Sequence, residues 1–483
     1  MGLLGILVGL GLLVFLSFRG WSVLLLAPAA ALVVALFAGE PLLAHWTLTF
    51  MSSAAGFIAQ FFPLFLLGAL FGKLMEDSGS VAAIAGFMTE RLGTRRAMLA
   101  VVLSGALVTY GGVSLFVAFF VLAPMGFVLF RAAGIPRRLM PAALALGTST
   151  FTMSALPGTP SIQNAIPMPF FGTTPFAAPG LGLIASAIML GFGLWWLARA
   201  EAGARTAGEG FGDARDAAVA DAASDELVRE RAAVSQSFDP AEATHGAQGS
   251  GLPSVTAAFA PLVVVIGVNL LMSLVVLPRM DVSFLAQPPF GTTLSAVGGV
   301  WSVSVALAAA IATVIALNFR RFPALRQTMD AGANASVLPI LSVASLVGFG
   351  AVVAAMPAFE LVRDWVLGIG GGPLVSLAVA TNVLAGLTGS ASGGLTIALE
   401  SLGPTFMQIA ADTGLSPDLM HRVAVIGAGT LDSLPHNGAV ITLLAVCGCT
   451  HRESYRDIAV AAIVGPVIAL VVVIVLGTLF GAF

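Results

Sequence analysis

Residues 147–160 read GTSTFTMSALPGTP, and residues 427–438 read GAGTLDSLPHNG. Both stretches are polar and rich in glycine, and both interrupt long apolar sequence. Their first glycines lie 280 positions apart, and Pro157 and Pro435 lie 278 apart. The sequence therefore indicates an internal duplication whose helices break at matching places. Since unwound backbone at membrane depth is tolerated only where it lines a cavity, the two breaks indicate the binding site of a transporter.

The composition indicates a membrane protein. Of the 483 residues, 58% are hydrophobic and 9% are charged, and the mean hydropathy is +1.00. Many apolar runs reach the roughly 20 residues that span a bilayer. We therefore expect an all-α polytopic protein in contact with the lipid bilayer. The formal net charge of −3 lies in loops and one linker, and no nucleic-acid partner is expected.

Apolar runs recur in the same order in both halves. The first half, 1–198, is expected to contain helices over 3–17, 21–38 and 52–72, an interfacial segment near 80–90, a re-entrant hairpin over about 97–130, a broken helix over about 140–171 and a closing helix over 180–198. The second half, 254–483, is expected to contain helices over 257–278, 291–318 and 336–357, an interfacial segment near 358–368, a hairpin over about 373–411, a broken helix over about 421–447 and a closing helix over 458–481. Each half then crosses the membrane five times. Because five is odd, the pattern predicts two inverted-topology repeats.

The hairpins are predicted from length and flanking charge. Arginines flank the stretch 97–130 at both ends, so both ends are expected on the cytoplasmic side. The stretch is too short for two full spans, and its polar tip is 109–114. The second hairpin has its tip at 388–394 and acidic flanks, which places it on the opposite face.

A charged segment separates the halves. Residues 199–253 carry five arginines and ten acidic residues among many Ala, Gly and Ser. This composition predicts a flexible linker with one amphipathic helix around 213–234. The distribution of arginines places the linker in the cytoplasm and both termini in the periplasm.

Two runs resemble a known family. FTMSALPGTPSIQNAIPMPFFGTT at 151–174 and LVTYGGVSLF at 107–116 are similar to the gluconate permease (GntP-type) family of bacterial symporters, within the ion transporter superfamily. The chain most resembles the branch of D-beta-hydroxybutyrate permeases, over nearly its whole length apart from the linker. The resemblance implies an elevator mechanism, a homodimer, proton coupling and a place in the bacterial inner membrane.

The hairpin tips bear on the coupling ion. They read Tyr-Gly-Gly-Val-Ser and Gly-Ser-Ala-Ser-Gly, where the sodium-coupled dicarboxylate carriers of the superfamily have Ser-Asn-Thr. Sodium sites of that type are therefore not expected, although sodium remains an alternative to the proton. No cofactor or metal is expected.

The tips and the breaks provide the candidate substrate site. No Lys or Arg falls inside these four motifs, so an anion is expected to bind backbone N–H groups at half-helix N-termini, together with hydroxyl groups. Such a site suits one carboxylate with a hydroxyl nearby. For each hydroxyl the alternative is a hydrogen bond to its own helix. The candidate substrate-binding residues are Thr109, Gly111, Gly112, Ser114, Thr152, Ser154, Pro157, Gly158, Thr159, Thr388, Gly389, Ser390, Ser392, Ser433, Pro435 and Asn437.

Ionisable residues in the second break suggest the coupling site. Asp432 and His436 are the candidates for proton coupling, because ionisable groups at membrane depth are costly and usually functional. The alternative is that Asp432 caps a half-helix and His436 makes a structural hydrogen bond. The charged residues 73, 76 and 77, at the end of a predicted span, are expected in a solvated loop.

These patterns predict a secondary active transporter that imports a small hydroxy-monocarboxylate with protons, and the resemblance implies that the substrate is 3-hydroxybutyrate. The alternative is a symporter of gluconate or another organic anion, coupled to protons or sodium. A channel built from duplicated re-entrant loops is a third class. An enzyme is not expected, because Asp432 and His436 have no nucleophile partner fixed by spacing.

Overall fold

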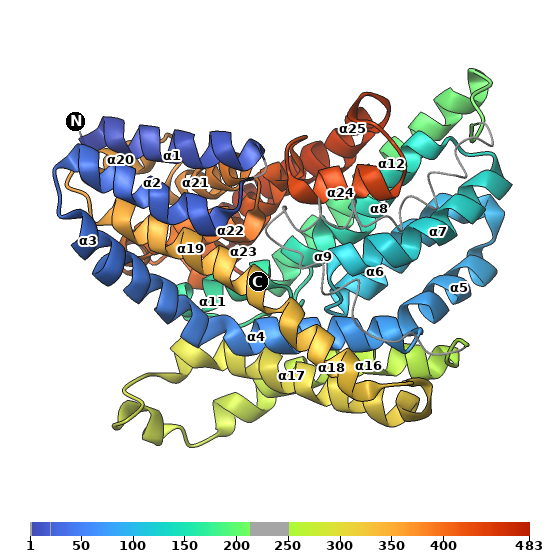
Figure 1. The fold of residues 1–483 in the computed structure, drawn as a ribbon, viewed down its shortest axis with the longest axis horizontal. Helices are drawn as coiled ribbons and strands as arrows, with labels where there is room; N and C mark the ends of the chain where they lie inside the picture. Colours follow the sequence, from blue (N-terminus) through green and yellow to red (C-terminus); the bar gives the residue numbers. More distant parts are fainter. Residues whose placement is uncertain (1, 20, 213–250) are drawn as a thin grey trace.

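All regular structure is helical in the residues that the structure, a computed structural model, describes: 2–19, 21–212 and 251–483 (Figure 1). Within these ranges seven helices are long and apolar enough to cross a membrane, or eight if a bent pair counts as one span. The protein is therefore a multi-pass membrane protein, as its composition predicts. The expected ten crossings include shorter and broken helices, and that number stays a prediction.

The first half opens with a helical pair and one very long helix. α1 (Gly2–Phe18) packs on α2 (Val23–Ala38). α3 (Leu42–Ala44), the π-helical turn His45–Phe50 and α4 (Met51–Asp77) form one apolar span of 36 residues. The predicted helix 52–72 is too short at both ends, because the helix continues through polar residues that had marked its limits.

The rest of the first half follows the predicted order, with one difference. Its helices are α5 (Ser80–Leu92), α6 (Ala97–Tyr110), α7 (Leu115–Ala133), α8 (Met140–Thr148), α9 (Phe151–Ser154), α10 (Ile162–Ala165), α11 (Pro167–Phe171) and α12 (Pro179–Thr206). A bend of 102° separates α5 from α6. Because α12 continues to Thr206, the expected linker 199–253 begins as helix. Its predicted amphipathic helix, 213–234, lies outside the described residues.

The second half repeats this order. Its helices are α16 (Val255–Leu271), α17 (Leu294–Asn318), α18 (Leu325–Ala335), α19 (Val337–Ala354), α20 (Phe359–Leu367), α21 (Pro373–Thr388), α22 (Ala391–Thr413), α23 (Pro417–Thr430), α24 (Gly438–Val446), α25 (His451–Ala459) and α26 (Gly465–Phe480). α18 was not expected as a helix, and α18 and α19 form one candidate span, Leu325–Ala354.

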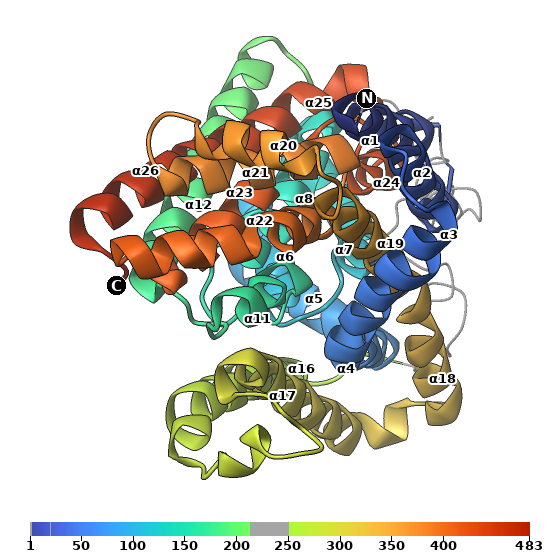
Figure 2. The same cartoon turned by 90° about the vertical axis from the view of Figure 1, so that its left-hand side faces the viewer.

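Corresponding helices form corresponding pairs. α6 packs on α8 and α21 packs on α23, while α1 packs on α2 and α16 on α17. α4 contacts α17, α18 and α19. Figure 2 shows α4 between the layer of α16, α17 and α18 and the remaining helices. Helix ends fall at both predicted tips, at 111–114 and at 389–390. That these hairpins are re-entrant stays a prediction. Of their four helices, α6, α7, α21 and α22, only α7 is by itself long and apolar enough to cross a membrane.

Corresponding glycines make a close helix crossing in each half. An ideal Cβ at Gly147 of α8 would overlap the carbonyl oxygen of Val102 in α6. One at Gly427 of α23 would overlap Thr381 Oγ1 in α21. Since these glycines begin the two repeated motifs, the duplication preserves a contact that holds each broken helix against a hairpin helix.

We expect Gly147→Ala and Gly427→Ala each to destabilise the protein by about 1–3 kcal/mol, because the added methyl group overpacks the crossing. Gly191→Ala in α12 is the control, since its Cβ would meet no described atom within 4 Å. Thermal unfolding in detergent measures the difference. Equal melting temperatures for all three variants would contradict the role given to these crossings.

Candidate functional site

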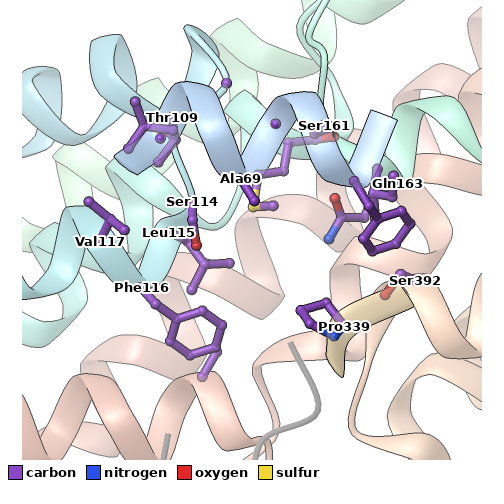
Figure 3. A pocket seen from close by; sticks show the side chains of 18 of the residues that line it. Ala69, Thr109, Ser114, Leu115, Phe116, Val117, Ser161, Gln163, Pro339 and Ser392 are labelled. Carbon is purple, nitrogen blue, oxygen red and sulfur yellow. Dashed lines mark hydrogen bonds between the residues drawn. The ribbon is translucent and has the colours of Figure 1, made fainter. Parts of the chain in front are cut away.

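A cavity of about 190 Å³ lies where the two tips and the two breaks meet α4 and the junction of α18 with α19 (Figure 3). Its wall comes from the facing ends of α6 and α7, the facing ends of α21 and α22, the start of α10 with the residues before it, and those around the second break. Segments more than 300 positions apart in the sequence therefore share one small space.

About half of the predicted site residues line this cavity. Those on the wall are Thr109, Gly112, Ser114, Gly389, Ser390, Ser392, Asp432 and Asn437. Those outside the cavity lining are Gly111, Thr152, Ser154, Pro157, Gly158, Thr159, Thr388, Ser433, Pro435 and His436. The structure thus brings together both tips with Asp432 and Asn437 of the second break, but leaves all five candidates of the first break outside the cavity lining.

Several candidate hydroxyls are bonded within their own helices. Thr109, Ser154 and Thr388 each donate to the carbonyl oxygen four residues earlier, at 2.8–3.0 Å. Thr152 donates to the carbonyl oxygens four and five residues earlier, at 3.2 and 3.1 Å. These bonds are the alternative that the sequence left open. To donate to a substrate, each of these hydroxyls would have to give up its hydrogen bond to the backbone carbonyl.

Side chains from other elements hold the backbone of the first break. Arg422 of α23 is fully buried and donates to Ser154 O at 3.2 Å, and also to Ala177 O, before α12, at 2.7 Å. Tyr110 donates its hydroxyl to Pro157 O at 2.8 Å, and Asn269 donates to Gly158 O at 2.9 Å. The unwound carbonyl groups are thereby satisfied inside the protein, so this break is held as a rigid wall.

The second break places a carboxyl group at the N-terminus of α22. Asp432 Oδ1 accepts from Ala391 N and from Asn437 Nδ2, both at 2.7 Å. Asn437 Nδ2 also donates to Gly389 O at 2.8 Å. One of the backbone donors expected to bind an anion is therefore held by the protein's own Asp432.

His436 lies next to α21 and away from the cavity lining. Its Nε2 lies 3.0 Å from the carbonyl oxygen of Gly386. This contact is the structural hydrogen bond considered as the alternative. A role for His436 in proton coupling stays a prediction.

The cavity contains a cation that sequence reasoning placed elsewhere. Lys73 of α4 lines the wall and is 5% exposed. Its Nζ lies 3.2 Å from Glu76 Oε2 and 3.2 Å from Asp77 Oδ1. The expectation of a solvated loop is wrong, because α4 continues through Asp77 and α18 covers it, with Thr328 donating to Asp77 Oδ2 at 2.7 Å. One signal was present: Lys73 is the only lysine among the 21 Lys and Arg of the chain.

Two polar residues of the first break were also missed. Ser161 and Gln163 lie on the cavity wall (Figure 3). Ser161 Oγ donates to Met153 O at 2.8 Å. Gln163 Oε1 is buried and has no hydrogen-bond partner among the described residues. A buried acceptor without a donor is unfavourable, so the Gln163 amide is an unusual feature of this wall.

Comparison with known proteins places the chain among permeases. The model of the GntP family permeases matches residues 1–168. The chain is 40% identical over 468 residues to an uncharacterized transporter, YxjC, of Bacillus subtilis (strain 168), and the match covers 95% of each protein. It is 33% identical over 165 residues to a high-affinity gluconate transporter of Escherichia coli (strain K12), covering 33% of this chain and 35% of that protein.

The chain's two tyrosines provide a matched test of the rigid break. Tyr110→Phe should destabilise the protein by about 1–3 kcal/mol, because Pro157 O loses its donor inside the protein. Tyr455→Phe is the control: its hydroxyl donates to Ser433 O at 3.2 Å, a longer bond than the 2.8 Å bond of Tyr110, so its loss should cost less. Thermal unfolding compares the two variants. A Tyr110→Phe protein as stable as the wild type would refute the account.

Proposed function

Because the chain belongs to the GntP permease family, we propose that it is a secondary active transporter that imports a small hydroxy-monocarboxylate together with a proton. One observation carries this proposal. Among the described residues that line the cavity, Lys73 is the single basic side chain and Asp432 the single acidic one. A site with one cation can balance one carboxylate, and its acid can carry one proton.

The substrate class follows from charge and size. Charge at membrane depth is expensive, so a second or third carboxylate would lack compensation in this cavity. The volume of about 190 Å³ is below the ~300–1,000 Å³ typical of drug-sized sites. Gln163 lines the cavity, and its buried Oε1 has no partner among the described residues, so we propose that its amide turns to accept from a substrate hydroxyl. These features support a short hydroxy acid, and we propose 3-hydroxybutyrate.

Gluconate is the second candidate, because one relative is a gluconate transporter. It also has a single carboxylate, which fits the single cation. Its longer polyol chain needs more hydrogen-bond partners than a short hydroxy acid, whereas several hydroxyls near the cavity are already bonded to backbone carbonyls. The geometry therefore favours the smaller substrate.

We place proton coupling at Asp432. Its carboxylate accepts from Ala391 N and Asn437, so its charge is held by donors at the start of α22. Protonation removes its charge and weakens both bonds, since hydrogen bonds to ionised groups are the stronger ones. The corresponding residue of the first break is Ser154, so this chemistry belongs to one half. The other ionisable groups near it are Lys73 across the cavity and His436 in the same break.

We propose an elevator mechanism for the movement. The recurring element order and the matched pairs, α6 with α8 and α21 with α23, support two inverted repeats. In this arrangement the hairpins and broken helices carry the substrate past a scaffold that includes α16 and α17. A homodimer in the bacterial inner membrane, with the linker 199–253 in the cytoplasm, completes the proposal.

The test is uptake into proteoliposomes with an imposed pH gradient. The wild type should accumulate radiolabelled 3-hydroxybutyrate against its gradient. Asp432→Asn should still exchange internal for external substrate but lose accumulation, because an amide accepts hydrogen bonds and cannot cycle a proton. Asp412→Asn, at an exposed acid of α22, is the control and should behave as the wild type.

Two outcomes would refute this proposal in different ways. Full proton-driven accumulation by Asp432→Asn would place coupling elsewhere. Accumulation of gluconate but not 3-hydroxybutyrate by the wild type would establish the second candidate.

Gln163→Leu tests the substrate hydroxyl. We expect it to weaken 3-hydroxybutyrate binding by a factor of ~5–10, the equivalent of one hydrogen bond of about 1–1.5 kcal/mol. Binding of butyrate, which lacks the hydroxyl, should not change. Competition against radiolabelled 3-hydroxybutyrate measures both ligands. Equal losses for the two would mean that Gln163 shapes the cavity without contacting the hydroxyl.

A further inference from the structure

Lys73 differs from every other cation of this chain. All the other Lys and Arg positions are arginine, so the composition strongly disfavours lysine. Yet lysine stands at a nearly buried position on the wall of the cavity. An ammonium on a flexible stem can exchange one partner for another, whereas a guanidinium prefers a fixed planar geometry. The residue type therefore indicates a cation that changes partners.

The surroundings of Lys73 leave room for an anion. Gly68, Ala69 and Gly72 line the same face of α4, and an ideal Cβ at Gly68 would meet no described atom within 4 Å. One at Gly72 would lie 3.7 Å from Ser114 N. Gly72 is thus the residue of α4 that approaches the start of α7, and Lys73 is the next residue in the chain. Figure 3 shows Ala69 and Ser114 on the cavity wall.

The N-terminus of α7 faces this space. Ser114 and the first three residues of α7, 115–117, all line the cavity. The Ser114 side chain makes no capping bond to the described N–H groups of α7. The positive end of a 19-residue helix and an ammonium group therefore lie on the same part of the wall, and both favour a carboxylate.

The two acids beside Lys73 differ in burial. The Asp77 side chain is 1% exposed and accepts from Thr328, whereas the Glu76 side chain is 12% exposed. Because burying an ammonium without a counter-ion costs several kcal/mol, these acids stabilise Lys73 when the cavity is empty. Glu76 is the partner that can turn away when another anion arrives, while Asp77 keeps the lysine in place.

We propose that Lys73 binds the carboxylate of the transported anion, between its Nζ and the N-terminus of α7, and that this carboxylate displaces Glu76. The inference rests on the proposed function and names the residue that recognises the substrate's charged group. The alternative is that Lys73 has only a structural role, in an ion-pair cluster that joins α4 to α18. The two accounts give opposite expectations for Glu76 and for a neutralised cluster.

The test is equilibrium binding of radiolabelled 3-hydroxybutyrate, with radiolabelled gluconate in parallel, to purified full-length variants. Lys73→Gln should weaken binding about tenfold or more, the equivalent of a hydrogen bond to a charged group. Glu76→Gln should bind as tightly as the wild type or more tightly, because it removes the competing carboxylate. Lys73→Gln with Asp77→Asn removes one charge of each sign, which protects the fold, and should bind as weakly as Lys73→Gln alone.

Chemical modification gives a second readout. Because Lys73 is the only lysine, reductive methylation of protein carrying a lysine-free tag modifies this side chain and the N-terminal amine. Saturating 3-hydroxybutyrate should slow modification of Lys73 but not of the N-terminus, as peptide mass spectrometry can measure. An unchanged rate at Lys73 in wild-type protein that binds the ligand would overturn the inference.

The binding outcomes separate this inference from the proposed function. If the wild type binds neither probe, the proposed function fails. If the wild type binds and folded Lys73→Gln binds equally well, only the inference fails. Recovery of wild-type affinity in the double variant, or a loss in Glu76→Gln equal to that in Lys73→Gln, would establish the structural cluster and overturn the inference.

Discussion

Unpaired backbone groups cannot face lipid, and the structure is organised around this constraint. Each broken helix exposes N–H and C=O groups that a continuous helix would pair, and no water is available in the hydrocarbon core to replace the lost partners. In the first break, side chains from distant elements supply the donors: Tyr110, Asn269 and the fully buried Arg422. In the second, Tyr455 donates to Ser433 O, while Asp432 and Asn437 bond to each other and to Ala391 N and Gly389 O at the second tip. The first solution is rigid, whereas the second contains an ionisable group and can change with its protonation.

Because of this difference, the two halves differ in function. The duplicated backbone provides two similar walls, with the same glycine crossing in each half. Chemistry was then added unequally, with Asp432 in the second break and Lys73 on α4 of the first half. Opposite charges on separate elements allow an anion and a proton to enter one small space with little net change in charge. Such compensation is valuable where each uncompensated charge is expensive.

The sequence predicted the breaks and tips well, because glycine, proline and a 280-residue repeat mark them directly. It did not predict which side chains face the cavity. The hydroxyls of Thr152 and Ser154 lie in the correct motif, but each is bonded to its own helix, and composition does not reveal the direction of a side chain. Lys73 was misplaced because a charge near the end of an apolar run usually marks a helix end, whereas here α4 and α18 bury it. Long-range packing decided that position, and no local pattern records it.

The length of the span that carries Lys73 has a consequence for the membrane itself. Its 36 residues extend over about 54 Å at 1.5 Å per residue, while the hydrocarbon core is about 30 Å thick. A helix that exceeds the bilayer by this much must lie strongly inclined or deform the lipid around it. The inclination of this helix then depends on the length of the lipid acyl chains. The depth of the Lys73 ammonium group in the membrane depends on that inclination. Lipid composition should thus alter the position of the substrate-binding cation in the membrane.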